Sequence, residues 1–101
     1  SGWTAAAATS FTITCAQLFN STAQNVSGVL TVHASDKSTG TPRNGVLTAT
    51  VLRGTGAFEV SVTAAATSNL ATFTLAASGA SSLLVTLSNA CRVCWTLVGS
   101  A

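Results

Sequence analysis

Hydrophobic and polar residues alternate along most of this chain. In the run from Phe11 to Cys15, for example, two threonines separate three apolar residues. An apolar side opposite a threonine-rich side is typical of a strand with one buried face, because successive side chains of a strand point to opposite faces. Thr and Val also favour strands through their β-branching. The alternation predicts strands over residues 11–15, 30–34, 47–51, 58–64, 71–77, 83–88 and 91–98.

Turn-forming residues separate these runs. The longest connection, residues 36–45, ends in an Asn-Gly pair, and residues 53–56 are typical of a tight hairpin. About seven short strands at this spacing predict an all-β fold, and no stretch between them predicts an interior helix. We expect a single small antiparallel β-sandwich, immunoglobulin-like or jelly-roll-like. The apolar side of each run is expected to face its core, as in Phe58, Val60, Val62 and Ala64.

Residues 1–10 differ from the rest of the chain. They are uncharged and contain four consecutive alanines and one large side chain, Trp3. Two interpretations remain open: a first strand that lies on its own domain, or an extended arm that inserts into a neighbouring subunit by strand addition. We therefore divide the chain into an N-terminal arm, residues 1–10, and a β-sandwich domain, residues 11–101.

The chain carries very little charge. Only 6% of its 101 residues are charged and its net charge is +2, whereas about a quarter of an ordinary domain is charged. Because a soluble monomer usually relies on scattered charge, we expect copies of the chain or attached sugar to cover this surface. Lys and Arg form no cluster, which predicts no nucleic-acid partner. No apolar run approaches ~20 residues, so no membrane span is expected.

The three cysteines are Cys15, Cys91 and Cys94. The alternation places Cys15 and Cys91 on inward sides, which predicts a disulfide between them, with Cys94 as the alternative partner or unpaired. Cys91 and Cys94 point to opposite faces of one strand and lie roughly 10 Å apart, too far to bond to each other. In the remaining interpretation all three stay reduced as small core residues.

Two N-glycosylation motifs lie close together in an expected loop. Asn20 and Asn25 each begin an Asn-x-Ser/Thr triplet. Together with the cysteines they favour a secreted, extracellular glycoprotein with covalent glycans. The surface of a virion is the alternative location.

The sequence offers little material for catalysis. General acid–base chemistry needs a positioned titratable group, and the single histidine, His33, is predicted to be an outward strand residue. One His, three Cys and two carboxylates spread along the chain predict no metal site. Phosphate-binding and dinucleotide-binding motifs are absent from the sequence, so no cofactor is expected. We therefore expect no enzymatic activity and assign no catalytic residues.

Several apolar residues fall outside the inward sets. Contiguous exposed apolar residues mark interaction sites, and the candidates for assembly contacts are Trp3, Phe19, Leu52, Leu84 and Val98. We expect a non-enzymatic structural subunit that self-assembles as a homopolymer into an extracellular filament or surface layer. The alternatives are a small virion or phage coat or decoration protein, and a carbohydrate-binding or adhesive module.

Overall fold

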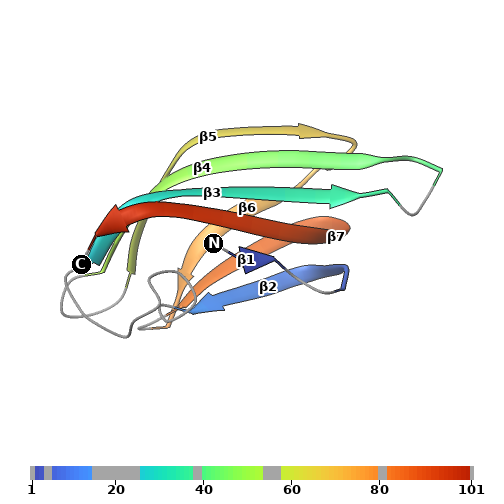
Figure 1. The fold of residues 1–101 in the computed structure, drawn as a ribbon. Coiled ribbons are helices and arrows are strands. Elements are labelled where there is room, and N and C mark those ends of the chain that lie inside the picture. Colours follow the sequence, from blue (N-terminus) through green and yellow to red (C-terminus); the bar gives the residue numbers. More distant parts are fainter. Residues whose placement is uncertain are drawn as a thin grey trace.

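The computed structural model describes residues 2–3, 6–14, 26–37, 40–53, 58–79 and 82–100. In these ranges the chain is all-β and every strand pairing is antiparallel, which confirms that part of the predicted fold class (Figure 1). The strands are β1 (Gly2–Trp3), β2 (Ala8–Thr14), β3 (Val26–Asp36), β4 (Arg43–Arg53), β5 (Phe58–Ser68), β6 (Phe73–Ser78) and β7 (Ser82–Ser100).

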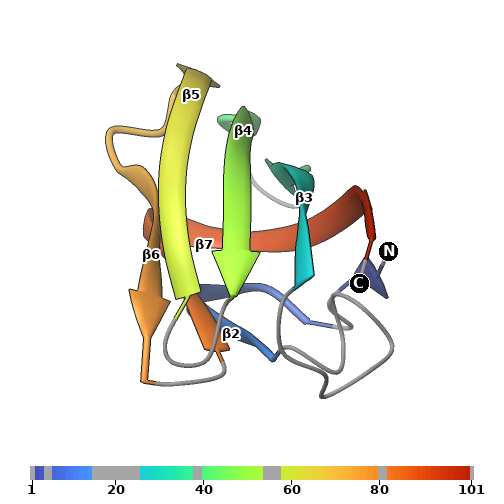
Figure 2. The same ribbon diagram turned by 90° about the vertical axis from the view of Figure 1, so that its left-hand side faces the viewer.

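Strand β7 connects the two halves of the fold. Its first part pairs with β2 and β6, and its second part pairs with β1 and β3. From there the sheet continues in the order β1-β7-β3-β4-β5. Figure 2 shows β7 crossing from the strands β3, β4 and β5 to the strands β2 and β6. Because β7 joins all the strands, a sandwich of two separate sheets, immunoglobulin-like or jelly-roll-like, is not confirmed.

The predicted strand runs correspond to β2–β7 rather than to seven strands. The last two runs, 83–88 and 91–98, form the single strand β7, because the chain continues extended through Asn89 and Ala90. The remaining strand, β1, is only two residues long. A count of about seven strands is therefore not confirmed.

The segment predicted as an N-terminal arm contributes two strands in the structure. The strand β2 begins at Ala8, and the strand β1 pairs with the chain's own β7, Gly2 opposite Trp95 and Trp3 opposite Cys94. This pairing agrees with the interpretation of a first strand on its own domain. Insertion of the arm into a neighbouring subunit stays a prediction.

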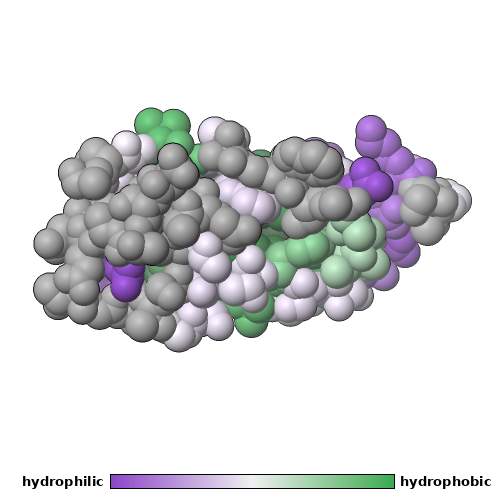
Figure 3. Space-filling view, turned by 60° about the horizontal axis from the view of Figure 1, so that its bottom comes forward, coloured by the Kyte–Doolittle hydropathy of each residue, from purple (hydrophilic) through white to green (hydrophobic). Residues whose placement is uncertain are grey.

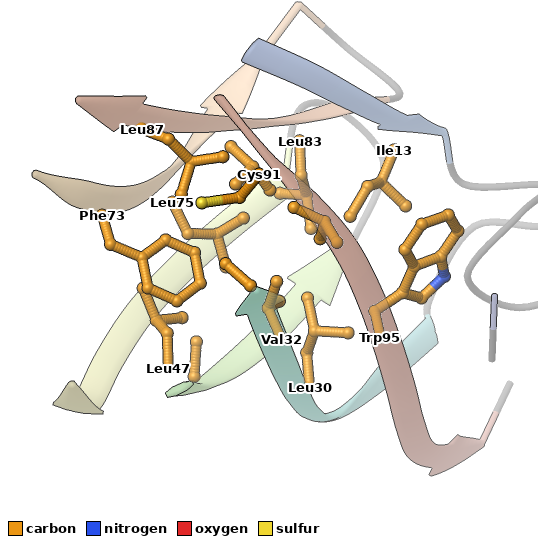
Figure 4. Packing of buried hydrophobic residues seen from close by; sticks show 14 of the residues in the cluster. Ile13, Leu30, Val32, Leu47, Phe73, Leu75, Leu83, Leu87, Cys91 and Trp95 are labelled. Atoms are coloured by element: carbon orange, nitrogen blue, oxygen red, sulfur yellow. The ribbon is translucent and has the colours of Figure 1, made fainter. Parts of the chain in front are cut away.

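The apolar residues of the alternating runs form one core between the two halves of the fold. Figure 4 shows Leu47, Val32 and Trp95 pointing into the same space as Ile13, Leu83 and Cys91. Among the described residues, no polar or charged side chain is buried with them. Leu97, also predicted to point inward, is half-buried. The other inward residues predicted for β3, β4 and β7 are confirmed as buried: Leu30, Val32, Ala34, Leu47, Ala49, Val51, Leu83, Val85, Leu87, Cys91, Val93 and Trp95.

Gly45 on β4 marks the closest packing of this core. The ring of Phe73 and the side chain of Leu70 lie over Gly45, and a Cβ atom added there would lie 2.8 Å from Cδ2 of Phe73. The absence of a side chain at residue 45 therefore lets the β6 side of the core contact β4.

The inward pattern predicted for β5 is wrong in its second half. Phe58 is buried and Val60 is half-buried, but Val62 is 44% exposed and Ala64 is exposed. The register with β4 shifts here, because Thr48 pairs with Ala64 whereas Ala49 pairs with Val62. Thr63 is the extra residue, and a bulge of this kind reverses the side on which Ala64 lies. Val62 precedes the bulge and pairs with the buried Ala49, yet it is itself exposed. The hydroxyl of Thr63 donates a hydrogen bond to the carbonyl of Thr48 at 3.1 Å.

Candidate assembly surface

The side of the sheet that faces away from the core is formed by β7, β3 and β4. Register places its side chains in rows across the three strands, such as Val98 beside Val29 and Thr96 beside Thr31. We call this surface the outer face; it consists of Cys94, Thr96, Val98, Val29, Thr31, His33, Asn44, Val46, Thr48, Thr50 and Leu52. All of these residues are exposed except Thr48, which is half-buried.

The charged residues lie toward the two ends of the sheet, and two of them, Arg92 and Glu59, are on its outer side, beside Ser35 and Leu52. The end of the sheet at the β3–β4 turn carries Asp36, Lys37 and Arg43. Arg92 of β7 lies at the same end, where it is the cross-strand partner of Ser35. Arg43 Nη1 lies 3.6 Å from Asp36 Oδ2. The other two charged residues, Arg53 and Glu59, lie at the opposite end of the sheet. In Figure 3 the strongly hydrophilic colours gather mainly at the β3–β4 end. The middle of the outer face is therefore an uncharged surface of threonine and valine.

Apolar side chains concentrate toward the end of the outer face that is opposite the β3–β4 turn. Val98 is 74% exposed, its cross-strand partner Val29 is 46% exposed, and Leu52 lies diagonally across from Val29. An open groove of about 500 Å³ adjoins them. It is lined by Ser27, Gly28, Thr50, Val51, Leu52, Glu59, Val60 and Ser61. Exposed apolar residues that adjoin one another are typical of contact surfaces.

The strand β5 forms the edge of the sheet next to this groove. It pairs with β4 on one side, and among the described residues no strand pairs with its other side. Every residue from Ser61 to Ser68 is exposed. Its only charged residue, Glu59, lies near its start. Such an edge presents backbone N–H and C=O groups that can pair with another chain.

Three polar side chains of the outer face contact one another at the charged end. Nε2 of His33 lies 2.6 Å from Oδ1 of Asn44, and Nδ1 of His33 lies 3.8 Å from Sγ of Cys94. These residues come from the adjacent strands β3, β4 and β7. His33 is exposed, as its position in the alternation predicted.

The structure places the two described cysteines on opposite sides of β7. Both carry free thiols, Cys91 buried in the core and Cys94 exposed. Burial raises the pKa of the Cys91 thiol, the charge of Asp36 raises it further, and the charge of Arg43 lowers it. Because Cys15 lies outside the described residues, its bridge to Cys91 or Cys94 stays a prediction.

The residues predicted as assembly contacts or glycosylation sites do not share one location in the structure. Leu52 and Val98 are exposed on the outer face, and Leu84 is half-buried on β7, between Thr12 of β2 and Ala76 of β6. The backbone of Trp3 pairs with that of Cys94. Phe19, Asn20 and Asn25 lie outside the described residues.

Sequence reasoning missed part of this surface. Val29 and Val46 each lie one residue before a predicted run, 30–34 or 47–51, and were not among the candidates, although each falls on the outward side of its strand. The contacts of His33 with Asn44 and Cys94 depend on the pairing of β3 with both β4 and β7. The alternation of side chains along each strand predicted that His33 and Cys94 point outward. Only the pairing of β3 with β7 brings the two residues together.

Other kinds of site find no support in the described ranges. No group of three or more His, Cys, Asp or Glu residues there is placed to hold a metal ion, and no helix there is long and apolar enough to cross a membrane. Comparison with protein-family models, curated proteins and solved structures finds no match for this chain. The outer face and the β5 edge are therefore the features of the described residues that bear on function.

Proposed function

We propose that this chain is a non-enzymatic structural subunit that self-assembles into an extracellular filament or surface layer. The observation that carries the proposal is the uncharged outer face, with its exposed apolar residues next to the unpaired β5 edge. A dispersed monomer normally interrupts such surfaces with charge. Here the six charged residues lie at the two ends of the sheet, and the surface between them remains suitable for contact with another copy.

The β5 edge supports assembly by strand pairing. Edge strands are usually protected by Lys, Pro, charged residues that point inward, or bulges. From Val60 to Ser68 the strand β5 contains no Lys, Pro or charged residue, and the bulge at Thr63 is its one such feature. Pairing of this edge with a different edge of a neighbouring copy is head-to-tail. Contacts of that kind repeat without closing and produce fibres when the rotation between copies does not close a ring.

The N-terminal strand supplies a second route to assembly, through a different contact. In the structure β1 pairs with β7 of its own chain, Trp3 opposite Cys94. The same pairing formed with β7 of a neighbour would be strand addition in which the arm is exchanged between copies. The proposed location is extracellular, where glycans on Asn20 and Asn25 would cover other parts of the surface.

The test places a single positive charge on each proposed contact. Val62→Lys lies on the β5 edge and Val98→Lys lies on the outer face. Gly40→Lys is the matched control, because a Cβ atom at Gly40 meets nothing within 4 Å and the residue lies at the charged end. Size is measured by light scattering and sedimentation, and particle shape by negative-stain electron microscopy, on reduced protein produced without glycans.

The expected result is concentration-dependent polymer for the wild type and the control. At least one of the two contact variants should be smaller, with an unchanged circular dichroism spectrum and melting temperature. If the wild type stays monomeric at high concentration in dilute salt, the proposal is wrong. If both contact variants assemble as the control does, these surfaces are not the contacts and the proposal in this form is also wrong.

A further inference from the structure

The contacts of His33 define the protonation of its ring. The side-chain oxygen of Asn44 is only an acceptor, so the nitrogen that lies 2.6 Å from it, Nε2, carries the proton. In a neutral imidazole the other nitrogen, Nδ1, then has the free lone pair. Nδ1 is the atom that lies 3.8 Å from Sγ of Cys94. The thiol of Cys94 therefore donates to a base that Asn44 holds in the correct tautomer.

We propose that Cys94, His33 and Asn44 form a reactive-thiol site that undergoes exchange with small disulfides at the outer face. His33 accepts the proton of the Cys94 thiol, and Asn44 is a positioning residue that keeps Nδ1 of His33 available. A thiolate beside a cationic imidazole is the usual arrangement of reactive cysteines. The site is a place of covalent modification, and it does not depend on the assembly proposed above.

The sheet holds the three residues in a fixed arrangement. His33 pairs with Cys94 across β3 and β7, and Asn44 lies one row away from His33 on β4. Strands paired on both sides vary little in position, so the contacts do not depend on a mobile loop. Cys94 is exposed, which leaves its sulfur accessible to a small molecule.

Few other charged groups surround the thiol. Among the described residues, those that face Cys94 from β3 and β4 are His33, which titrates, and Val46 and Asn44, which do not. Arg92 lies two residues before Cys94 on the same side of β7. Gly2 and Trp3 of β1 carry no titratable side chain. The contact with Nδ1 of His33 is therefore the main polar interaction that the structure gives the thiol on this face.

The reaction is a balanced thiol–disulfide exchange. The proton of Cys94 passes to Nδ1 of His33, and the thiolate attacks one sulfur of the small disulfide. The sulfur–sulfur bond of the reagent breaks, a new bond forms between Cys94 and that sulfur, and the second half leaves as a thiolate. The imidazolium of His33 returns the proton to this leaving thiolate. The disulfide reagent is the oxidant, and it is reduced to one thiol for each Cys94 modified.

Cys91 provides an internal control in the same molecule. It lies three residues from Cys94, but its side chain is buried in the core and no part of it is exposed. Trypsin cleaves after Arg92, so Cys91 and Cys94 fall in different peptides, and Cys94 lies in the peptide of residues 93–101. Mass spectrometry can therefore follow each thiol separately without replacing any cysteine.

The test measures the rate at which 2-hydroxyethyl disulfide modifies Cys94 in reduced protein from pH 6 to pH 9. This reagent is neutral, so Arg92 does not attract it. The variants are His33→Ala, Asn44→Leu, which removes the acceptor, and Asn44→Asp, which keeps one. All are prepared in a Val62→Lys background, which keeps assembly separate from thiol reactivity, and their folding is checked by circular dichroism.

We expect His33→Ala to slow modification of Cys94 at pH 7 roughly tenfold, because an ordinary thiol is only a few per cent thiolate there. Its rate should then rise with pH as for an ordinary thiol, whereas the wild-type rate should change less. Asn44→Leu should also be slow, Asn44→Asp should restore the rate, and imidazole in solution should partly rescue His33→Ala. Equal rates and pH profiles for wild type and His33→Ala would overturn the proposal, as would modification of Cys94 no faster than that of Cys91.

Discussion

The two faces of β4 differ in what their residues do. Toward the core, the strand presents Gly45, Leu47, Ala49 and Val51, all buried. On the outer face it presents Val46, Thr48, Thr50 and Leu52, which carry no charge although most of them are exposed. Packing explains the composition of the inner face, since every atom there contacts another part of the fold. It does not explain the outer face, where folding would tolerate Lys or Glu equally well, whereas the contact with a second copy that we propose would explain it.

The largest expected difference between the two faces is in stability. Leu47 is 1% exposed and Leu52 is 44% exposed on the same strand. Leu47→Ala should lower the free energy of unfolding by about 2–5 kcal/mol, because it leaves a cavity in the core. Leu52→Ala should lower it by less than about 1 kcal/mol while weakening assembly. Urea unfolding checks both variants, and equal losses would contradict the distinction between the faces.

A smaller loss of stability is expected when a methyl group is added at Gly45, where the core is closely packed. Gly45→Ala would place a methyl group against the ring of Phe73 and should lower the free energy of unfolding by roughly 1–3 kcal/mol. Gly40→Ala is the control, because that residue is exposed and surrounded by open space, and its effect should stay within about 0.5 kcal/mol. Thermal melts of the two variants measure the difference. A stable Gly45→Ala protein would mean that Phe73 does not pack on β4 as described.

The smallest effect concerns the inward thiol at alkaline pH. Burial and the charge of Asp36 raise the pKa of Cys91 above its usual value of 9.0, although Arg43 opposes this. The unfolded chain then loses this proton at lower pH than the folded chain, so stability that is present below pH 9 falls as the pH rises toward the folded pKa. Urea unfolding at pH 7.5 and pH 10 should show a smaller fall for Cys91→Ala than for the wild type. An equal fall in both proteins would exclude a contribution from Cys91.

The inner face was the part of the fold that alternation could predict. Runs such as Leu30–Ala34 have an apolar residue at every second position, so each of them predicts a strand and its buried side. The prediction failed at β5, since a bulge at Thr63 changes the register without a distinctive residue to mark it. It also divided β7 into two runs at Asn89-Ala90, where two ordinary residues continue a single strand.

The outer face was predictable only in part. The outward positions of Leu52, Val98 and His33 follow from counting along a strand. Their neighbours follow from which strands lie side by side, and β3 pairs with β7 across more than fifty residues of sequence. Local patterns do not specify such distant pairings, because the entropy of closing long loops and the packing of the whole core decide them together. The contact of His33 with Cys94 could not be predicted from the sequence for this reason.

The place of β7 in the chain affects how the protein is made. β2, β3 and β6 all pair with β7, and all of them leave the ribosome before it does. During synthesis these earlier strands have to wait for their common partner, and the sheet closes only when the segment from Ser82 onward has emerged. Folds dominated by pairings between distant segments form slowly. A nascent chain of this type stays open and accessible to chaperones until β7 has been synthesised.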